Sequence, residues 1–116
     1  MKTASFFSYK GPGRISIARR APFSAAPGFK SYPALAPGPW FMSVDQEKYR
    51  ELYFRHLGEL NAAAVLDDLL WLAHPHEPVL LCYEAKAASA AGSTFCHRHM
   101  VASWFRTELG LIVPEI

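Results

Sequence analysis

Residues 78–104, PVLLCYEAKAASAAGSTFCHRHMVASW, decide the fold that we predict for this chain. The stretch opens with a continuous apolar run at 79–83, which is typical of a strand covered on both faces. Small residues follow, and a helix is expected to begin near Ser93 or Thr94 and to end at Gly110. A strand, a loop and a helix in this order form half of an α/β unit.

The composition fits one globular domain, residues 1–116. The chain is 51% hydrophobic and 19% charged, and a chain of 116 residues can bury one core. No run approaches the roughly 20 apolar residues that span a bilayer. The N-terminus starts like a signal peptide, but Tyr9 and Lys10 end its apolar part early. We therefore expect a soluble, cytoplasmic protein without a membrane partner, whose two cysteines are reduced.

Positive charge is concentrated in the first 44 residues. The formal net charge of +2 is too small to indicate nucleic-acid binding by itself. However, all ten acidic residues lie at or beyond Asp45. The cations before that point are Lys2, Lys10, Arg14, Arg19, Arg20 and Lys30. This cationic part predicts, as an alternative function, a surface for nucleic acid or a protein partner.

Two strands are predicted near the N-terminus, at residues 2–9 and 14–19, because both segments are rich in β-forming residues. The sequence KGPG between them, at 10–13, is typical of a turn. A turn of this length cannot make a parallel crossover. The two strands therefore form either an antiparallel hairpin or an arch, and both alternatives stay open.

Residues 21–43 are predicted to form a long irregular loop. Its five prolines exclude a helix or an interior strand, and its five aromatic residues favour an ordered conformation. Such a loop either covers a site or is a surface loop anchored by its aromatic side chains. Trp40 and Phe41 from this loop, together with Trp71, could form a contact between two copies of the chain.

Two helices are predicted between this loop and the 78–104 stretch. Ser43 and Gln46 form a capping box at the start of the first helix. Its apolar stripe includes His56, which we interpret as a packed histidine. Asn61 is the predicted cap of the second helix, residues 62–73. The residues expected to be buried there are Val65, Leu66, Leu69, Leu70 and Leu72, whereas Trp71, Asp67 and Asp68 are expected on the outer face.

Chemistry is expected where the strand at 79–83 ends and the last helix begins, because ligands of open α/β sheets bind beyond the carboxyl ends of the strands. The start of the helix lowers a thiol pKa, so Cys96 is the predicted nucleophile. Glu84 and His97 are the predicted proton-transfer residues. Arg98 is predicted to bind an anion through its planar guanidinium group.

Two other interpretations of this junction stay open. In one, both cysteines and either His97 or His99 bind a metal ion. The spacing lacks the close cysteine pair of structural zinc sites, so no metal or cofactor is expected. In the other, Cys82 is a small buried residue and Arg98 pairs with Glu84.

Six short motifs are spread over nearly the whole chain. They are LLCYE at 80–84, CHR at 96–98, KTASFF at 2–7, SIARRAP at 16–22, YPALAP at 32–37 and GLIVPE at 110–115. Together they resemble domain-of-unknown-function family 488, and LLCYE followed by CHR is the most specific pair. The resemblance implies a small α/β fold, often encoded by bacteria and their mobile elements, without an assigned activity.

This family usually has a helix between its first two strands and an acidic residue paired with arginine in the second strand. Here only the turn at 10–13 and the pair Ala18-Arg19 are present, so the chain resembles a shortened branch of the family. The site positions that the resemblance implies are Cys82, Glu84, Cys96, His97 and Arg98, with Arg19 as the counterpart on the second strand.

The predicted fold is therefore α/β, with a small, partly parallel sheet flanked by about three helices in a Rossmann-like three-layer or two-layer arrangement. The predicted function is that of an enzyme or binding domain for a small molecule or nucleotide that carries phosphate or carboxylate. Arg98 and Arg19 are predicted to hold the anion at the junction between Cys82 and Arg98. The sequence does not decide between an enzyme and a binding domain.

Overall fold

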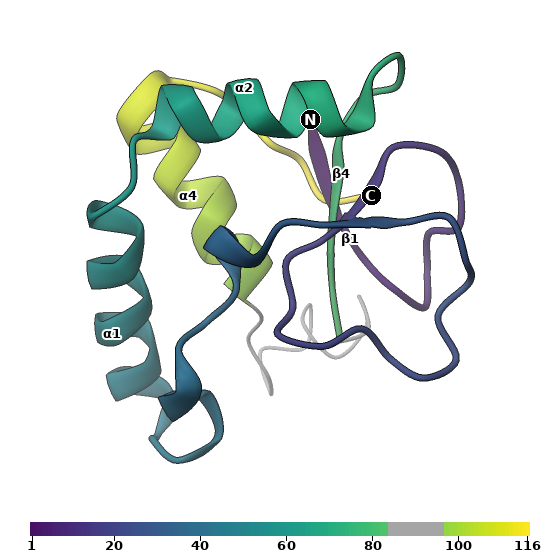
Figure 1. Ribbon diagram of the computed structural model, residues 1–116. Coiled ribbons are helices and arrows are strands. Elements are labelled where there is room, and N and C mark those ends of the chain that lie inside the picture. The colour runs from purple at the N-terminus through teal and green to yellow at the C-terminus, as the bar shows by residue number, and fades with distance from the viewer. Residues whose placement is uncertain (84–96) are drawn as a thin grey trace.

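The computed structural model describes residues 1–83 and 97–116, and it confirms the α/β class. Four strands form one sheet in the order β1-β4-β2-β3 (Figure 1). They are β1 (Lys2–Ser5), β2 (Arg14–Ser16), β3 (Lys30–Ser31) and β4 (Val79–Cys82). Each pairing between these strands is parallel, so the sheet that we expected to be partly parallel is parallel throughout.

Strand β4 lies between β1 and β2. Val79 is in register with Lys2 on one side and with Arg14 on the other. All four residues of β4 are buried, as its continuous apolar sequence predicts. Because β4 separates β1 from β2 and pairs in parallel with both, the hairpin alternative for the first two strands is wrong. The exclusion of a parallel crossover is wrong as well, because the first strand ends at Ser5 and not at Tyr9, which leaves residues 6–13 for the return.

The return from β1 to β2 uses residues 6–13 and contains no helix. Gly13 ends this connection with a φ of +82°, in the left-handed region that favours glycine. A Cβ atom at this position would collide with the carbonyl oxygen of Glu77. Glycine therefore lets the connection pass closely beside the segment that leads into β4.

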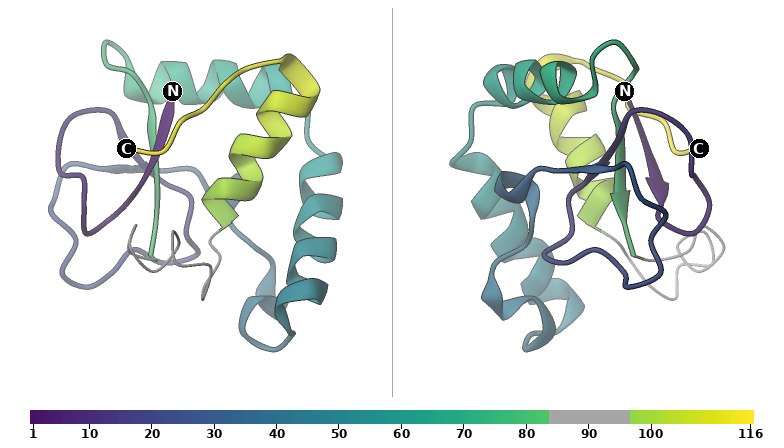
Figure 2. Two further views of the ribbon diagram at one scale, coloured as in Figure 1. Left: turned by 180° about the vertical axis from the view of Figure 1, so that it is seen from behind. Right: turned by 45° about the vertical axis from the view of Figure 1, so that its right-hand side comes forward.

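In the described ranges, three helices cover one face of the sheet (Figure 2). They are α1 (Gln46–Gly58), α2 (Ala62–Ala73) and α4 (His97–Leu109), and their core includes Ile15, Ile17 and Leu80 from the strands. None of the helices in the described ranges has both the length and the apolar character needed to cross a bilayer.

The other face of the sheet is covered by irregular segments. Ala4, Phe6, Val79 and Leu81 form a small second core there, and Phe6 packs edge-on against Phe29 with ring centroids 5.6 Å apart. Since the described helices all pack against the first face, the described part of the chain has the two-layer arrangement.

The predicted start of α1 is wrong by two residues. Its N-cap is Asp45, whose carboxylate accepts a hydrogen bond of 2.8 Å from the backbone N–H of Lys48. The Ser43 hydroxyl donates instead to the carbonyl oxygen of Trp40. The chain is still in a 3-10 turn, η2 (Pro39–Met42), just before Ser43, so the serine closes that turn and not the helix.

The predicted bounds of α2 are confirmed. The side chain of Asn61 accepts a hydrogen bond from the backbone N–H of Ala64, and Val65 and Leu69 are buried. Leu70 was expected to be buried but is 47% exposed, because it lies at the edge of the apolar stripe beside the exposed Trp71. The start predicted for the last helix, at Ser93 or Thr94, lies outside the described residues.

The segment 21–43 contains two short 3-10 turns and one edge strand, as its prolines allow. The turns are η1 (Pro33–Leu35) and η2. Three hydrogen bonds hold its middle part to the helices. The Tyr53 hydroxyl donates to the carbonyl of Leu35, the His56 ring bonds to the carbonyl of Ala34, and the Tyr32 hydroxyl donates to Asp68.

These bonds explain two polar side chains that the sequence analysis singled out, His56 and Asp68. His56 is a packed histidine, as predicted, with its Nε2 atom 2.7 Å from the Ala34 carbonyl oxygen. Asp68 lies on the outer face and accepts a 2.7 Å hydrogen bond from Tyr32. Burial, and then this hydrogen bond, raise the pKa of Tyr32 to about 12, so the phenol remains a donor.

Arg98 is fully buried and pairs with Glu115. Its Nε and Nη2 atoms each lie 3.0 Å from a Glu115 carboxylate oxygen. The Thr3 hydroxyl donates a 2.6 Å hydrogen bond to the same carboxylate. The backbone of Thr3 also bonds to Pro114 and Ile116, so this C-terminal segment runs along β1. An isolated parallel bridge joins Thr3 to Glu115.

We expect Glu115→Gln to lower the free energy of unfolding by about 3 kcal/mol, because it removes the carboxylate charge that contacts the buried Arg98 guanidinium. Urea denaturation at pH 7 measures this change. Glu108→Gln is the matched control, since Glu108 is exposed on α4. A loss of less than about 0.5 kcal/mol for Glu115→Gln would show that this ion pair does not hold the C-terminal segment in place.

Candidate functional site

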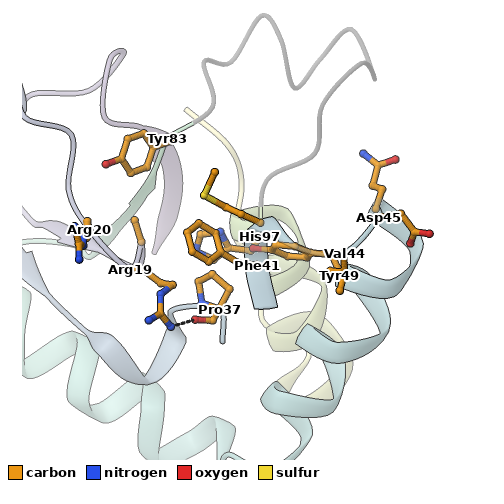
Figure 3. Close-up of a pocket in the computed structure, with 12 residues that line it drawn as sticks. Arg19, Arg20, Pro37, Phe41, Val44, Asp45, Tyr49, Tyr83 and His97 are labelled. Atoms are coloured by element: carbon orange, nitrogen blue, oxygen red, sulfur yellow. Dashed lines mark hydrogen bonds between the residues drawn. The ribbon is translucent and has the colours of Figure 1, made fainter. Parts of the chain in front are cut away.

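A pocket of about 880 Å³ lies beyond the carboxyl ends of β2 and β4 (Figure 3). Arg19 and Arg20 come from the turn after β2, Tyr83 follows β4 directly, and His97 opens α4. This is the edge at which open α/β sheets bind their ligands. The rest of the lining consists of Ala18, Pro37, Phe41, Met42, Val44, Asp45, Gln46 and Tyr49.

Arg19 is held in place at the pocket wall. Its Nη1 atom donates a 3.1 Å hydrogen bond to the carbonyl oxygen of Pro37 (Figure 3), and its guanidinium carbon lies 5.6 Å from the centre of the Phe41 ring. The Phe41 ring face attracts the cation. Arginine has five N–H groups, so Arg19 can keep both contacts and still offer donors to a ligand.

Arg20 is exposed beside Arg19. Within the part of the chain that the structure describes, its side chain makes no hydrogen bond or ion pair. A second guanidinium at the same wall strengthens the attraction for an anion. Among the described residues that line the pocket, Asp45 is the one acidic residue, and it belongs to the start of α1.

His97 joins the end of β2 to the start of α4. The side chain is 7% exposed, its Nε2 atom lies 2.7 Å from the carbonyl oxygen of Ile17, and its ring packs edge-on against Tyr53. Burial, more than the nearby charge of Arg98, lowers the pKa of His97 to about 4. The ring is therefore neutral near pH 7 and donates through Nε2. Its predicted proton-transfer role stays a prediction.

The other residues of the predicted site are distributed differently. Glu84 and Cys96 lie outside the described residues, so their roles stay predictions. Arg98 is not part of the pocket lining, and its guanidinium pairs with Glu115. The predicted anion-binding role of Arg98 is therefore left without support from its position.

Cys82 is fully buried, as the structural interpretation of this residue predicts. It is disulfide-bonded, so the expectation of a reduced thiol is wrong for Cys82. That expectation depended on the compartment assumed for the chain and not on the position of the sulfur. Arg98 donates a hydrogen bond to the Cys82 sulfur over 3.1 Å. No group of three or more potential metal ligands occurs in the described ranges.

The position of the pocket, its lining and its two arginines are the observations that bear on function. No protein-family model, curated protein or solved structure matches this chain. The resemblance to family 488 stays a prediction. Function must therefore be inferred from the chemistry of the pocket itself.

Sequence reasoning identified Arg19 and His97 but missed Arg20, Asp45 and Tyr83 as pocket residues. Arg20 could have been found as the second member of a basic pair after a strand. The sequence also distinguishes Asp45, because it is the first acidic residue of the chain and follows directly after the cationic part. Tyr83 stands between Cys82 and Glu84, the two residues that the sequence analysis singled out at the end of this strand.

The low pKa of His97 predicts acid sensitivity. The unfolded chain binds a proton to this histidine below about pH 6.5, whereas the folded chain does so only below about pH 4. Stability is therefore highest above pH 6.5 and falls by about 1.4 kcal/mol per pH unit between these values. Urea denaturation from pH 7 to pH 4 measures this slope.

His97→Gln should flatten the slope, because glutamine has no proton to gain in this range. His76→Gln is the control, since His76 is exposed and lies outside the pocket lining. It should retain the part of the slope that comes from His97. An unchanged slope in His97→Gln would contradict the assignment.

Proposed function

We propose that the pocket beyond β2 and β4 binds a small molecule that carries a phosphate or carboxylate group. The observation that supports this proposal is the pair Arg19 and Arg20, which line one wall of a pocket of about 880 Å³. This volume lies within the range of roughly 300–1,000 Å³ that is typical of ligand sites. Guanidinium groups form paired hydrogen bonds with both kinds of anion.

Arg19 is suited to such a role because its position is fixed before a ligand arrives. Its bond to Pro37 and its contact with Phe41 restrict the side chain. Less conformational entropy is then lost on binding. Arg20 supplies the second charge and is free to adjust to the shape of the anion.

The rest of the lining favours a ligand with an apolar or aromatic body. Phe41, Met42, Tyr49 and Tyr83 contribute aromatic and thioether surface. Burial of a ring against such surface adds hydrophobic stabilisation to the charge contact. Inorganic phosphate alone should therefore bind more weakly than an organic phosphate.

The chain also fits, by its motifs, the shortened branch of family 488 proposed from the sequence. Chemical conversion of the bound molecule would depend on Cys96, Glu84 and His97, whose roles stay predictions. Because Cys82 is disulfide-bonded and the chain has two cysteines, this test needs protein treated with a reductant. Selective alkylation of Cys96 near neutral pH in the reduced protein would support a reactive thiol, because only the thiolate reacts quickly.

The alternative function is a nucleic-acid module built on the cationic N-terminal part. The contacts of these cations favour it less than they favour the pocket. Arg14 donates to the backbone carbonyls of Gly11, Ala26 and Pro27, and Lys2 pairs with Glu77. Two of the six cations are therefore held by other groups of the chain, and two more, Arg19 and Arg20, line the pocket. Fewer charges then remain for a phosphate backbone.

Arg20→Ala should weaken the binding of ribose 5-phosphate about tenfold, since one charge-assisted hydrogen-bond pair is lost. Isothermal titration calorimetry at low salt measures the affinity. Arg106→Ala is the matched control, because it makes the same change in net charge on the exposed surface of α4. This control should bind like the unmodified protein.

Equal losses in Arg20→Ala and Arg106→Ala would indicate unspecific attraction and contradict the pocket. Titration with a short DNA duplex and with a short RNA, at several salt concentrations, distinguishes small-molecule binding from the nucleic-acid alternative. Tighter binding of either, with a steep salt dependence, would favour the nucleic-acid module.

A further inference from the structure

The pocket has opposite charges at its two ends. Figure 3 shows Arg19 and Arg20 on one side and Asp45 on the other, with Phe41, Tyr49 and His97 between them. The arginines belong to the turn after β2, and Asp45 belongs to the start of α1. Two arginines from the cationic first part of the sequence and its first acidic residue thus line opposite ends of a single cavity.

Asp45 can bind a ligand without giving up its role in the fold. One carboxylate oxygen caps α1 through the backbone N–H of Lys48. The other oxygen has no partner among the described residues, and Gln46 adds an amide at the same end of the pocket. This end therefore accepts hydrogen bonds, and it attracts a donor or a cation while repelling a second anion.

The middle of the pocket offers flat apolar surface. Tyr49 is itself fixed by an edge-on contact with Trp40, with ring centroids 5.2 Å apart. Phe41 is fixed by the guanidinium of Arg19. Two aromatic side chains held in this way can contact the ring of a ligand that lies between the charged ends.

A ligand that matches the pocket from the arginines to Asp45 has an anionic group at one end, a flat ring in the middle and a hydrogen-bond donor at the other end. We infer that the pocket takes a nucleoside monophosphate whose base carries an exocyclic amino group. Arg19 and Arg20 hold the phosphate, Phe41 and Tyr49 contact the base, and the amino group donates to Asp45. This inference rests on the proposed anion binding and adds the class of the ligand.

Three probes separate the parts of this ligand. Adenosine 5′-monophosphate has all three, purine riboside 5′-monophosphate lacks only the amino group, and adenosine lacks only the phosphate. Calorimetric titration of the unmodified protein should give the tightest binding for adenosine 5′-monophosphate. Each of the other two should bind about tenfold more weakly, because each loses a hydrogen bond to a charged group.

Two variants assign these losses to residues. Asp45→Asn keeps the helix cap, because asparagine caps as well as aspartate does, but it removes the charge. It should abolish the preference for the amino group while leaving purine riboside 5′-monophosphate unaffected within about twofold. Arg20→Ala should weaken both monophosphates and leave adenosine unchanged. Glu47→Gln is the control for Asp45, since Glu47 is exposed in the same turn and outside the pocket lining.

The outcomes distinguish this inference from the proposed anion-binding function on which it rests. Equal binding of the two monophosphates, with no effect of Asp45→Asn, would overturn the inference and leave anion binding intact. If no monophosphate and no sugar phosphate binds, the proposed function fails as well. Loss of the amino-group preference in Glu47→Gln would also contradict the role of Asp45.

Discussion

The structure depends on the placement of β4 between β1 and β2. The two N-terminal strands do not pair with each other, and each uses one edge of β4 for its hydrogen bonds. The parallel direction of all three strands brings their carboxyl ends to one side of the sheet. Tyr83 and the turn with Arg19 and Arg20 therefore meet there, so the geometry of the pocket follows from this pairing.

The second wall of the pocket is positioned by hydrogen bonds to backbone carbonyls. Tyr53 and His56 on α1 bind the carbonyls of Leu35 and Ala34, and Arg19 binds that of Pro37. A proline-rich segment has few N–H groups of its own, so its carbonyls need donors from elsewhere. These side chains hold the irregular segment in place, and its aromatic residues reach the site as a result.

Local patterns in the sequence predicted the elements that depend on local interactions. The bounds of α2 followed from the Asn61 cap and the apolar spacing, and β4 followed from its apolar run. The relation between the first two strands could not be predicted, because it depends on a strand far along the chain. Glu115 was not predicted as a partner of Arg98, because only the path of the C-terminal segment along β1 brings the two together. Of the predicted site, the structure places Arg19 and His97 at the pocket, whereas Arg98 is used inside the fold.

The Glu115 carboxylate also links two elements that are far apart in the sequence. Arg98 belongs to α4, Thr3 belongs to β1, and both side chains bind this carboxylate. A carboxylate held between a helix and a strand acts as a crosslink between them. Separation of α4 from β1 requires these bonds to break, so local opening of the helix should be coupled to local opening of the strand.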